Sequence, residues 1–417
     1  MGVLGAAGVV DISPDVPCAL GSSRYPGQKH LSVDARIEAN VVYLLRPDGS
    51  QILVVSIDAL YVDAEFVKLL GLRTGLDPSS VFVFASHTHQ APMLDRTKPK
   101  LGEVNPLHYA SVVKSVSDCA CKLIASNLSP VFLTIMGNRQ GDHSVNRRRV
   151  IKGVARLAPF PGGPRDETIA GFRLSSESGE VIAVFWNYAC HPVGFPNERA
   201  VSPHFPGVVR DLIRRRVGGS ATPVLFVQGF SADTKPKVTA VPSRASDLAR
   251  RILRGPLFYA MSVASYLSWT DSLASEVANS VEKLSAKETG SLVDIRTKNK
   301  YVPRSKFVRS DVGSETTRFS LLQFVGERTS SVIVGVGAEV PSSLAPFVRG
   351  LLEGSSSVLL GGCFDETYGY LQTEDMLSLG GYEVDGFLAP FSLDSVNVGA
   401  EATFRSSIAE LASRVFD

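Results

Sequence analysis

The sequence predicts an α/β fold in which a mixed, largely buried sheet is covered by helices and the functional site lies at strand ends. Short segments made almost entirely of apolar residues recur along the chain, as expected for strands buried on both faces. Longer segments with the periodicity of amphipathic helices alternate with them. Polar residues that can bind metal or react follow directly after several of the apolar segments.

Two hairpins predict the first strands, because each pair of strand-like segments flanks a short turn that contains Gly. The second strand of each hairpin is nearly all apolar, which predicts burial on both faces. The first hairpin pairs 36–45 with 51–57 around Pro47-Asp48-Gly49, and the second pairs 171–175 with 180–187 around Glu177-Ser178-Gly179. Further central strands are predicted at 80–85, 223–228 and 331–336.

Helical periodicity predicts helices at 106–127, 206–217, 272–287 and 401–415. Thr270 and Asp271 precede the third of these helices and are its candidate N-terminal caps. The Pro- and Gly-containing segments 158–164 and 217–223 are expected to be loops within a domain, because apolar segments continue on both sides at similar density.

The composition is that of an ordinary globular protein, with 44% hydrophobic and 20% charged residues in a chain of 417. A chain this long buries a core without help from disulfides or structural metal, so any metal would serve chemistry. The net charge of +2 gives no strong field, which excludes nucleic acid and membrane surfaces as partners held by charge. We expect a single domain over residues 1–417.

The five cysteines argue against a disulfide scaffold and against a thiolate zinc site, because their number is odd and none forms a CxxC pair. The first residues lack the charged start and long apolar segment of a signal peptide, and no stretch of about 18 apolar residues follows. The sequence therefore predicts a soluble, cytoplasmic protein without an integral membrane segment.

Metal-binding or reactive residues stand directly after five of the apolar segments. In sheets of this kind the carboxyl ends of strands meet at a shared crevice, so these side chains are expected to lie close together. They are Asp58, His87 with His89, His191, Ser231 with Asp233, and Glu339.

The spacing of His87 and His89 places both imidazoles on one side of an extended backbone. Each histidine has an alternative role as a hydrogen-bonded structural residue, and Glu339 has one as the partner of an arginine. Two or more histidines with a glutamate and no cysteine are nevertheless the ligand set typical of catalytic zinc. The sequence therefore predicts Zn²⁺ as a cofactor that would activate water and polarise a carbonyl group.

Taken in order, the motifs of this chain resemble those of the neutral/alkaline non-lysosomal ceramidase family over nearly its whole length. Each motif is short, and their shared order carries the resemblance. They are the opening GAAGVVDISP, the SIDAL segment at 56–60, Ser86-His87-Thr88-His89, Asn146-Arg147, the segment Asn187 to Pro192, Phe205-Pro206-Gly207, residues 229–233, Gly337-Ala338-Glu339, Tyr368-Gly369-Tyr370, and Gly381-Tyr382-Glu383.

The resemblance implies a zinc-dependent hydrolase that cleaves an amide bond of a small-molecule N-acyl substrate with activated water. The metal ligands that it implies are His87, His191, Glu339 and Tyr370, with Tyr368 as the nearest alternative to Tyr370. Cys190 could replace His191, but consecutive residues of a strand face opposite ways, so only one of the two can bind.

The resemblance also implies roles for residues around the metal. His89 would act on the transition state without binding the metal. Arg147 would contact a substrate oxygen or orient the ligands, unless it belongs to a solvated run of arginines. Asp233 would orient a ligand or pair with a cation, and the residues expected to contact substrate are Asn146, Ser231 and His204.

Two departures from the family pattern affect the expected substrate. Lys235 stands where the family motif carries a serine, so it could meet an anionic substrate group or be a solvated loop lysine. The chain also has no room for the C-terminal β-sandwich domain of longer ceramidases. A smaller or more polar substrate than ceramide is therefore expected.

Two further functions are compatible with the sequence. The same metal chemistry serves ester, lactone and glycosidic bonds, and a third possibility is a metal-binding or ligand-binding relative without catalysis. Retention of all four expected ligands argues against the third. The basic segment 296–309 could dock an acidic partner, although alternating charges on an exposed strand pair explain it more simply.

Overall fold

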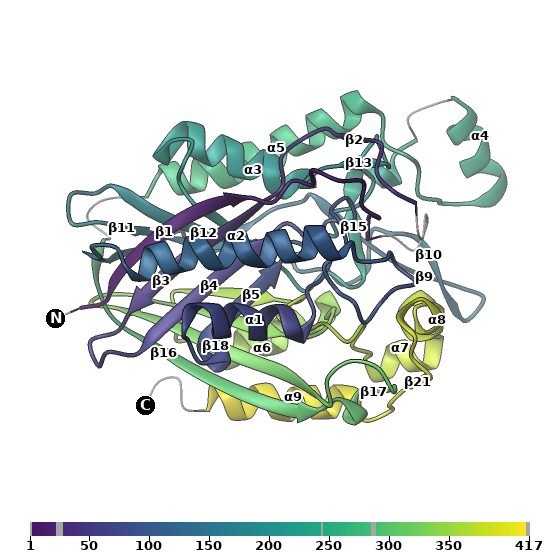
Figure 1. Cartoon of the computed structure of the whole chain (residues 1–417). Helices are drawn as coiled ribbons and strands as arrows, with labels where there is room; N and C mark the ends of the chain where they lie inside the picture. The colour runs from purple at the N-terminus through teal and green to yellow at the C-terminus, as the bar shows by residue number, and fades with distance from the viewer. Residues whose placement is uncertain (1, 22–27, 243–244, 285–288, 414–417) are drawn as a thin grey trace.

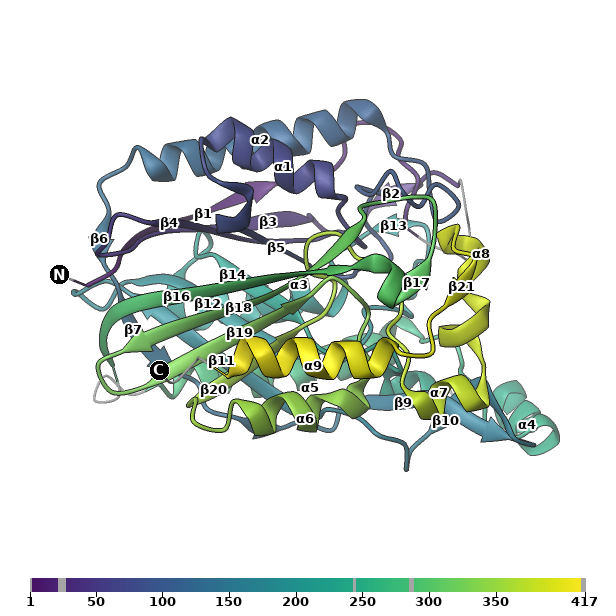
Figure 2. The ribbon, with the colours of Figure 1, turned by 90° about the horizontal axis from the view of Figure 1, so that it is seen from below.

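The computed structural model describes residues 2–21, 28–242, 245–284 and 289–413 (Figure 1). Two large sheets lie face to face, and helices cover their outer sides (Figure 2). The predicted α/β class is thereby confirmed. The strands, however, are divided between two main sheets, whereas the sequence had predicted one.

Within the described residues, the smaller main sheet has five strands in the order β5-β4-β3-β1-β6. Their bounds are β1 Leu4–Asp11, β3 Glu38–Leu45, β4 Gln51–Ile57, β5 Val81–Ala85 and β6 Ser129–Pro130. The antiparallel pair β3–β4 is the first predicted hairpin. Strand β5 runs parallel to β4, because helix α1 (Ala64–Thr74) carries the chain back to the start of the sheet.

The larger main sheet has nine strands in the part of the chain that the structure describes, in the order β14-β12-β11-β7-β16-β18-β19-β20, with β8 beside β11. Their bounds are β7 Phe132–Ile135, β8 Arg139–Gln140, β11 Thr168–Ser175, β12 Val181–Tyr188, β14 Val224–Gln228, β16 Gly290–Pro303, β18 Thr316–Gly326, β19 Ser330–Val336 and β20 Ser357–Gly361. The second predicted hairpin is β11–β12. The pairs β12–β14 and β19–β20 are parallel.

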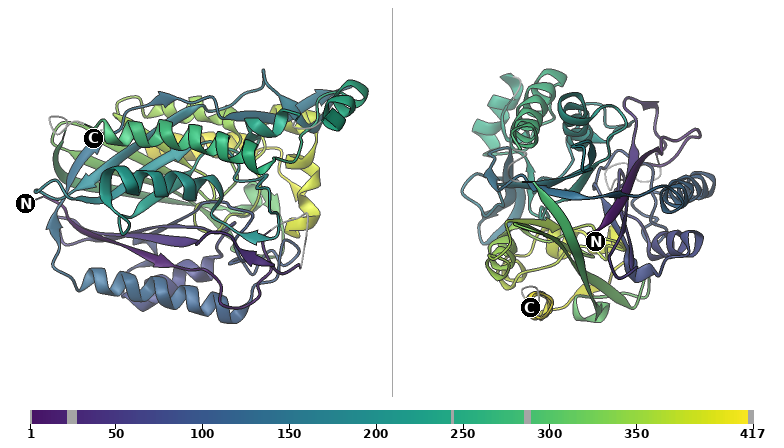
Figure 3. Two further views of the ribbon diagram at one scale, coloured as in Figure 1. Left: turned by 90° about the horizontal axis from the view of Figure 1, so that it is seen from above. Right: turned by 90° about the vertical axis from the view of Figure 1, so that its left-hand side faces the viewer.

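Helices lie on both outer faces of the pair of sheets (Figure 3). Helix α1 and helix α2 (Pro106–Ile124) cover the five-stranded sheet, with Phe66 and Val112 packed among its side chains. Helices α3 (His204–Ile213) and α5 (Val263–Glu282) pack on one half of the larger sheet, and α6 (Ala345–Leu351) and α9 (Ala400–Ala412) cover the other half.

Short elements complete the described chain. They are the strands β2 Ser32–Val33, β9 Ser144–Ile151, β10 Val154–Phe160, β13 Ala200–Val201, β15 Thr234–Pro236, β17 Val308–Arg309 and β21 Ser395–Val396, and the helices α4 Ala245–Arg254, α7 Glu374–Leu379 and α8 Leu388–Phe391. Strands β10, β9 and β15 form a small sheet of their own. The basic segment 296–309 lies largely on β16, which pairs with β18 along its length.

The space between the two main sheets is filled by large apolar side chains. The rings of Phe84 and Phe364 have centroids 5.0 Å apart, and those of Phe172 and Phe185 lie 4.6 Å apart. Gly335 faces the Phe364 ring so closely that an added Cβ would lie 2.7 Å from it. This inner core holds the two sheets, and therefore their strand ends, in a fixed relation.

Three local predictions need correction. Helix α5 begins at Val263, where the Ser262 side chain accepts a hydrogen bond from the Ser265 amide, so Thr270 and Asp271 lie inside the helix and do not cap it. The segment 158–164 is a loop only in part, because β10 runs to Phe160. The α-helical part of 206–217 ends at Ile213 and continues as a π-helical turn. Residues 285–287 and 414–415 of the predicted helices lie outside the described residues.

No helix in the described part of the chain has the length and apolar character needed to cross a membrane.

The inner core predicts a large stability effect at Phe364. Phe364→Ala would remove a fully buried ring from between the sheets and should lower the free energy of unfolding by about 3–5 kcal/mol. Leu72→Ala on helix α1 is the control, because Leu72 is 66% exposed and its loss should cost about 0.5 kcal/mol or less. Urea unfolding of both variants measures the difference, and equal midpoints would contradict this account of the core.

Candidate metal centre

The carboxyl ends of six strands from the two main sheets, β4, β5, β12, β14, β19 and β20, meet at one place. Backbone hydrogen bonds join the segments that follow them: Ser86 donates to the Ile57 carbonyl at 2.9 Å, Ala85 to Cys363 at 3.0 Å, and Gly362 to Gln228 at 2.9 Å. The predicted convergence of strand ends is therefore present. It brings residues from the five-stranded sheet next to residues from the nine-stranded sheet.

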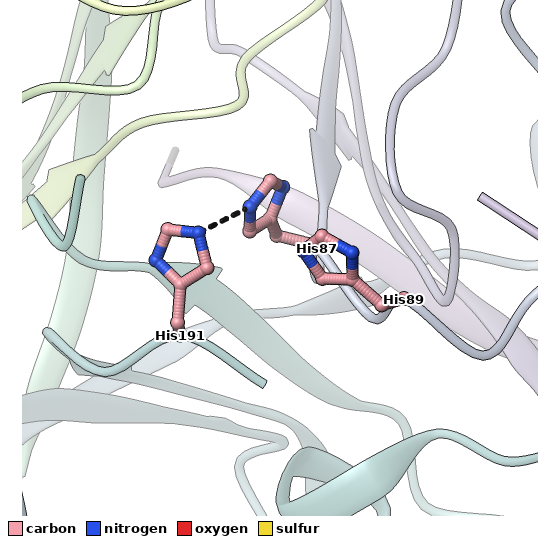
Figure 4. A group of neighbouring side chains, drawn as sticks. All are labelled: His87, His89 and His191. Carbon is pink, nitrogen blue, oxygen red and sulfur yellow. Dashed lines mark hydrogen bonds between the residues drawn. The ribbon is translucent and has the colours of Figure 1, made fainter. Parts of the chain in front are cut away.

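Three histidines cluster at this junction (Figure 4). The candidate ligand atoms of His87, His89 and His191 all lie within 4.8 Å of one another, and the Nε2 atoms of His87 and His191 are 3.0 Å apart. The expectation of an extended backbone at His87 was wrong, because its φ is 63°, in the left-handed region. The chain turns at His87, directly after β5, and the imidazole is buried.

Glu339 completes a tighter group with two of these histidines. Its Oε2 atom lies 3.4 Å from His87 Nε2 and 3.3 Å from His191 Nε2, and it accepts no hydrogen bond. A tetrahedral zinc ion with bonds of about 2.0–2.2 Å holds its ligand atoms roughly 3.3–3.5 Å apart. The two histidine–carboxylate distances match this spacing, and the 3.0 Å between the two Nε2 atoms is somewhat shorter. A bound cation would satisfy the otherwise unpaired buried oxygen.

Both histidines of this group are held by their other ring nitrogen. His87 Nδ1 lies 3.3 Å from the Leu60 carbonyl, and His191 Nδ1 lies 2.8 Å from the Ser231 carbonyl. An Nδ1–H bond to a carbonyl leaves Nε2 as the lone-pair donor, which is the tautomer a metal requires. Burial, together with Arg147 and His87, lowers the pKa of His191 to about 4, so its imidazole is neutral at pH 7.

Glu339 stays ionised in spite of its burial. Burial raises the pKa of this carboxyl, but His87 and His191 outweigh that effect and hold the pKa well below its usual value. Tyr61 also donates its hydroxyl to Glu339 Oε1, which directs Oε2 toward the histidines. Sequence reasoning missed Tyr61, although it follows Asp58 by three residues at a predicted strand end.

Tyr370, and not Tyr368, lies beside this group. Arg147 Nη2 donates to the Tyr370 hydroxyl at 3.1 Å, and a backbone bridge joins Tyr370 to Glu339. The Tyr368 ring instead stacks on Phe307, with centroids 5.2 Å apart. Of the two tyrosines, Tyr370 is therefore the one that lies next to Glu339.

Arg147 is a buried side chain and does not belong to a solvated run. It is 5% exposed, and its Nε donates to Glu383 Oε1 at 2.7 Å. Arg148 also pairs with Glu383 and is 9% exposed. Sequence reasoning did not assign Glu383 a role, and it is the carboxylate that fixes the Arg147 guanidinium against Tyr370.

Other predicted site residues form hydrogen bonds that hold neighbouring segments and the His191 ring in place. Asn146 Nδ2 donates to Asp233 Oδ2 at 3.0 Å, and the Ser342 amide donates to Asp233 Oδ1 at 2.8 Å. Burial raises the pKa of Asp233. Ser231 contributes the carbonyl that orients His191.

Two further residues lie apart from the ligand group. His204 packs among the aromatic rings of Phe195, Phe205 and Tyr266, with centroids 5.2–6.0 Å away. Asp58 pairs with Arg210 at 2.8 Å. Cys190 is buried in the apolar cluster beneath α3 and α5, so its position does not favour it over His191 as a ligand.

A cavity of about 480 Å³ adjoins the histidine cluster. His89 and Pro192 connect it to the ligand group, and Lys235 lies on its wall. Its volume is within the range of small-molecule sites, about 300–1,000 Å³.

The fold is similar to that of solved ceramidase structures. The crystal structure of neutral ceramidase from Pseudomonas aeruginosa superposes with a TM-score of 0.76 at 13% identity, covering 99% of this chain and 74% of that one. A ceramidase complexed with C2 gives 0.72 at 14% identity, covering 99% and 75%. No protein-family model and no curated protein sequence matches this chain. At these identities the likeness shows a ceramidase-like fold.

The ligand group predicts a defined metal content. The purified protein should carry about one zinc ion per chain, and His191→Ala and Glu339→Gln should each lose it. His108→Gln is the control, because His108 is a buried histidine on α2 whose Nε2 also has no partner. Elemental analysis measures the ratio. A wild-type protein that holds no metal and cannot be loaded with any would contradict the assignment.

Tyr61 should tune metal affinity without binding the metal. Tyr61→Phe removes only the hydroxyl that directs Glu339, so zinc affinity should fall about 10–100-fold while the fold is kept. The matched control is Tyr109→Phe, which removes a buried tyrosine–carboxylate bond to Asp63 outside the site. Competition with a chelator gives both affinities, and an equal effect of the two variants would show that Tyr61 has no special role.

Proposed function

We propose that this protein is a zinc-dependent hydrolase that cleaves the amide bond of an N-acyl compound. The observation that carries the proposal is the triangle formed by His87 Nε2, His191 Nε2 and Glu339 Oε2, with sides of 3.0–3.4 Å. The ceramidase-like fold supports the amide as the bond that is cleaved. Membership of the ceramidase family, with Tyr370 as the fourth ligand, is part of the proposal.

The residues of the triangle suit catalytic zinc better than structural zinc. Structural sites are closed by four protein ligands, most often with cysteine, whereas catalytic sites combine His and carboxylate ligands and keep a position open. Zinc in such a site supplies Lewis acidity and lowers the pKa of water to about 7. The cavity beside His89 gives a substrate access to this open side.

His89 is the group best placed to move a proton. Burial and the neighbouring His87 and His191 hold the pKa of His89 well below its usual value, so it is neutral at pH 7. Its Nε2 has no hydrogen-bond partner, and its ring faces both ligand histidines. In this proposal, His89 would take up at Nε2 the proton that the attacking water loses as its oxygen bonds to the carbonyl carbon, and would deliver that proton to the leaving nitrogen as the C–N bond breaks.

Arg147 serves as a fixed positive charge. Glu383 holds its guanidinium, and the guanidinium donates to the Tyr370 hydroxyl. Burial and the charge of Glu339 hold the pKa of Tyr370 well above its usual value, and Arg147 acts against this rise. The Arg147 cation would also stabilise negative charge that develops on a substrate oxygen. Asn146 and Asp233 position the strand that carries Arg147, because the Arg147 amide donates to the Asp233 carbonyl at 2.7 Å.

Hydrolysis of N-acyl amides tests the proposal. The zinc-loaded protein should release amine from short N-acyl amides, and His89→Gln should lower kcat about 10²–10⁴-fold while zinc content stays unchanged. His191→Ala should lose zinc and activity together. His108→Gln is again the control.

The same assay separates the alternative functions. If matched esters, lactones or glycosides are cleaved and no amide is, then the bond that the enzyme hydrolyses is not an amide. If zinc binds but no substrate of these classes is cleaved, a metal-binding protein without catalysis is the correct description.

A further inference from the structure

The cavity beside His89 has walls from five separate segments, of which His89 and Gln90 form one. The other four are the loop after β12 from Pro192 to Glu198, the region of β15 with Lys235 and Thr239, residues 258–261 before α5, and Leu157 of β10. Most of these side chains are apolar, with Phe195, Phe258 and Met261 among them. An apolar body of a ligand would therefore be buried here.

Three buried polar atoms of the lining residues have no hydrogen-bond partner. They are His89 Nε2, Gln90 Oε1 and the Tyr259 hydroxyl. Gln90 is 4% exposed, and its Nε2 already donates to the Asn197 carbonyl at 2.8 Å, so Oε1 is left as an acceptor. Unpaired buried polar atoms are costly, and three at one cavity indicate that a ligand supplies their partners.

Lys235 is the one Lys or Arg side chain among the described residues that line the cavity. Its ammonium lies 4.7 Å from the centroid of the Phe258 ring, which holds the charge at the wall. Lys235 and Glu198 already interact with other groups, so a ligand anion would join or replace these contacts.

We propose that the cavity binds a carboxylate of the substrate through Lys235, so that the substrate class is the N-acyl amino acids. An amide N–H of such a molecule would donate to Gln90 Oε1, its carboxylate would accept from Lys235 and Tyr259, and its side chain would fill the aromatic wall. The inference rests on the proposed function, because it places the scissile amide near His89. It also gives a reason for the lysine at a position where the family motif carries serine.

The test compares two probes of nearly the same shape, N-acetylphenylalanine with its negative charge and N-acetylphenylalanine amide without one. Calorimetry on the full-length wild-type protein should show at least about tenfold tighter binding of the carboxylate, the effect of one charged hydrogen bond. Lys235→Met should abolish this preference, Lys235→Arg should keep most of it, and Lys235→Glu should reverse it. Thermal unfolding and zinc content confirm that each variant is folded and loaded.

Two controls isolate the role of Lys235. Lys114→Met removes an exposed lysine that pairs with Asp118 on α2, away from the cavity, and should leave the preference unchanged. The titrations are repeated after metal removal, because a carboxylate can also bind zinc directly. The proposal is overturned if the preference for the carboxylate probe is lost on metal removal but persists in Lys235→Met. It is also overturned if the wild-type protein does not bind the carboxylate probe or does not prefer it to the amide.

The outcome is distinguishable from failure of the proposed function. If binding shows a Lys235-dependent preference for the carboxylate but no substrate is hydrolysed, the proposed carboxylate site stands and the proposed hydrolase activity does not. If neutral and acidic N-acyl compounds are cleaved equally well and with equal KM, the proposed hydrolase activity stands and the proposed carboxylate site does not.

Discussion

A buried carboxylate oxygen without a hydrogen-bond donor is the constraint on which the site depends. Glu339 Oε2 lies 3.4 Å from His87 Nε2 and 3.3 Å from His191 Nε2, and all three side chains are almost completely buried. Leaving such an anion unpaired is costly, and a cation shared with the two imidazoles removes the cost. Tyr61, the Leu60 carbonyl and the Ser231 carbonyl each hold one member of the triangle in the orientation that a cation needs.

The two-sheet architecture explains how this triangle is assembled. His87 follows β5 of the five-stranded sheet, whereas His191 and Glu339 follow β12 and β19 of the nine-stranded sheet. A metal at their centre would therefore link the ends of the two sheets. The aromatic core between the sheets sets their separation, so packing far from the site determines whether the three ligand atoms meet.

The site consists of two neighbouring regions, the buried ligand group and the cavity beside His89. The ligand triangle and the Arg147–Glu383 pair are almost completely buried, where charges act more strongly than in bulk water. The cavity beyond His89 is lined by loops and by Lys235, the residue that stands where the family motif carries a serine. Under the proposed function, strand ends would fix the residues of the chemistry and loops would shape the choice of substrate.

The sequence by itself determined two hairpins, part of the further strands and helices, and the polar residues that follow some of the strands. The two hairpins, the buried strands and the histidines and glutamate at strand ends were predicted, because alternation, apolar segments and Gly turns are local signals. The tertiary structure alone decided that the strands form two sheets, that Tyr61 holds Glu339 and that Glu383 holds Arg147. These partners are 278 and 236 residues apart, and contacts at such separations leave no periodic signal along the chain.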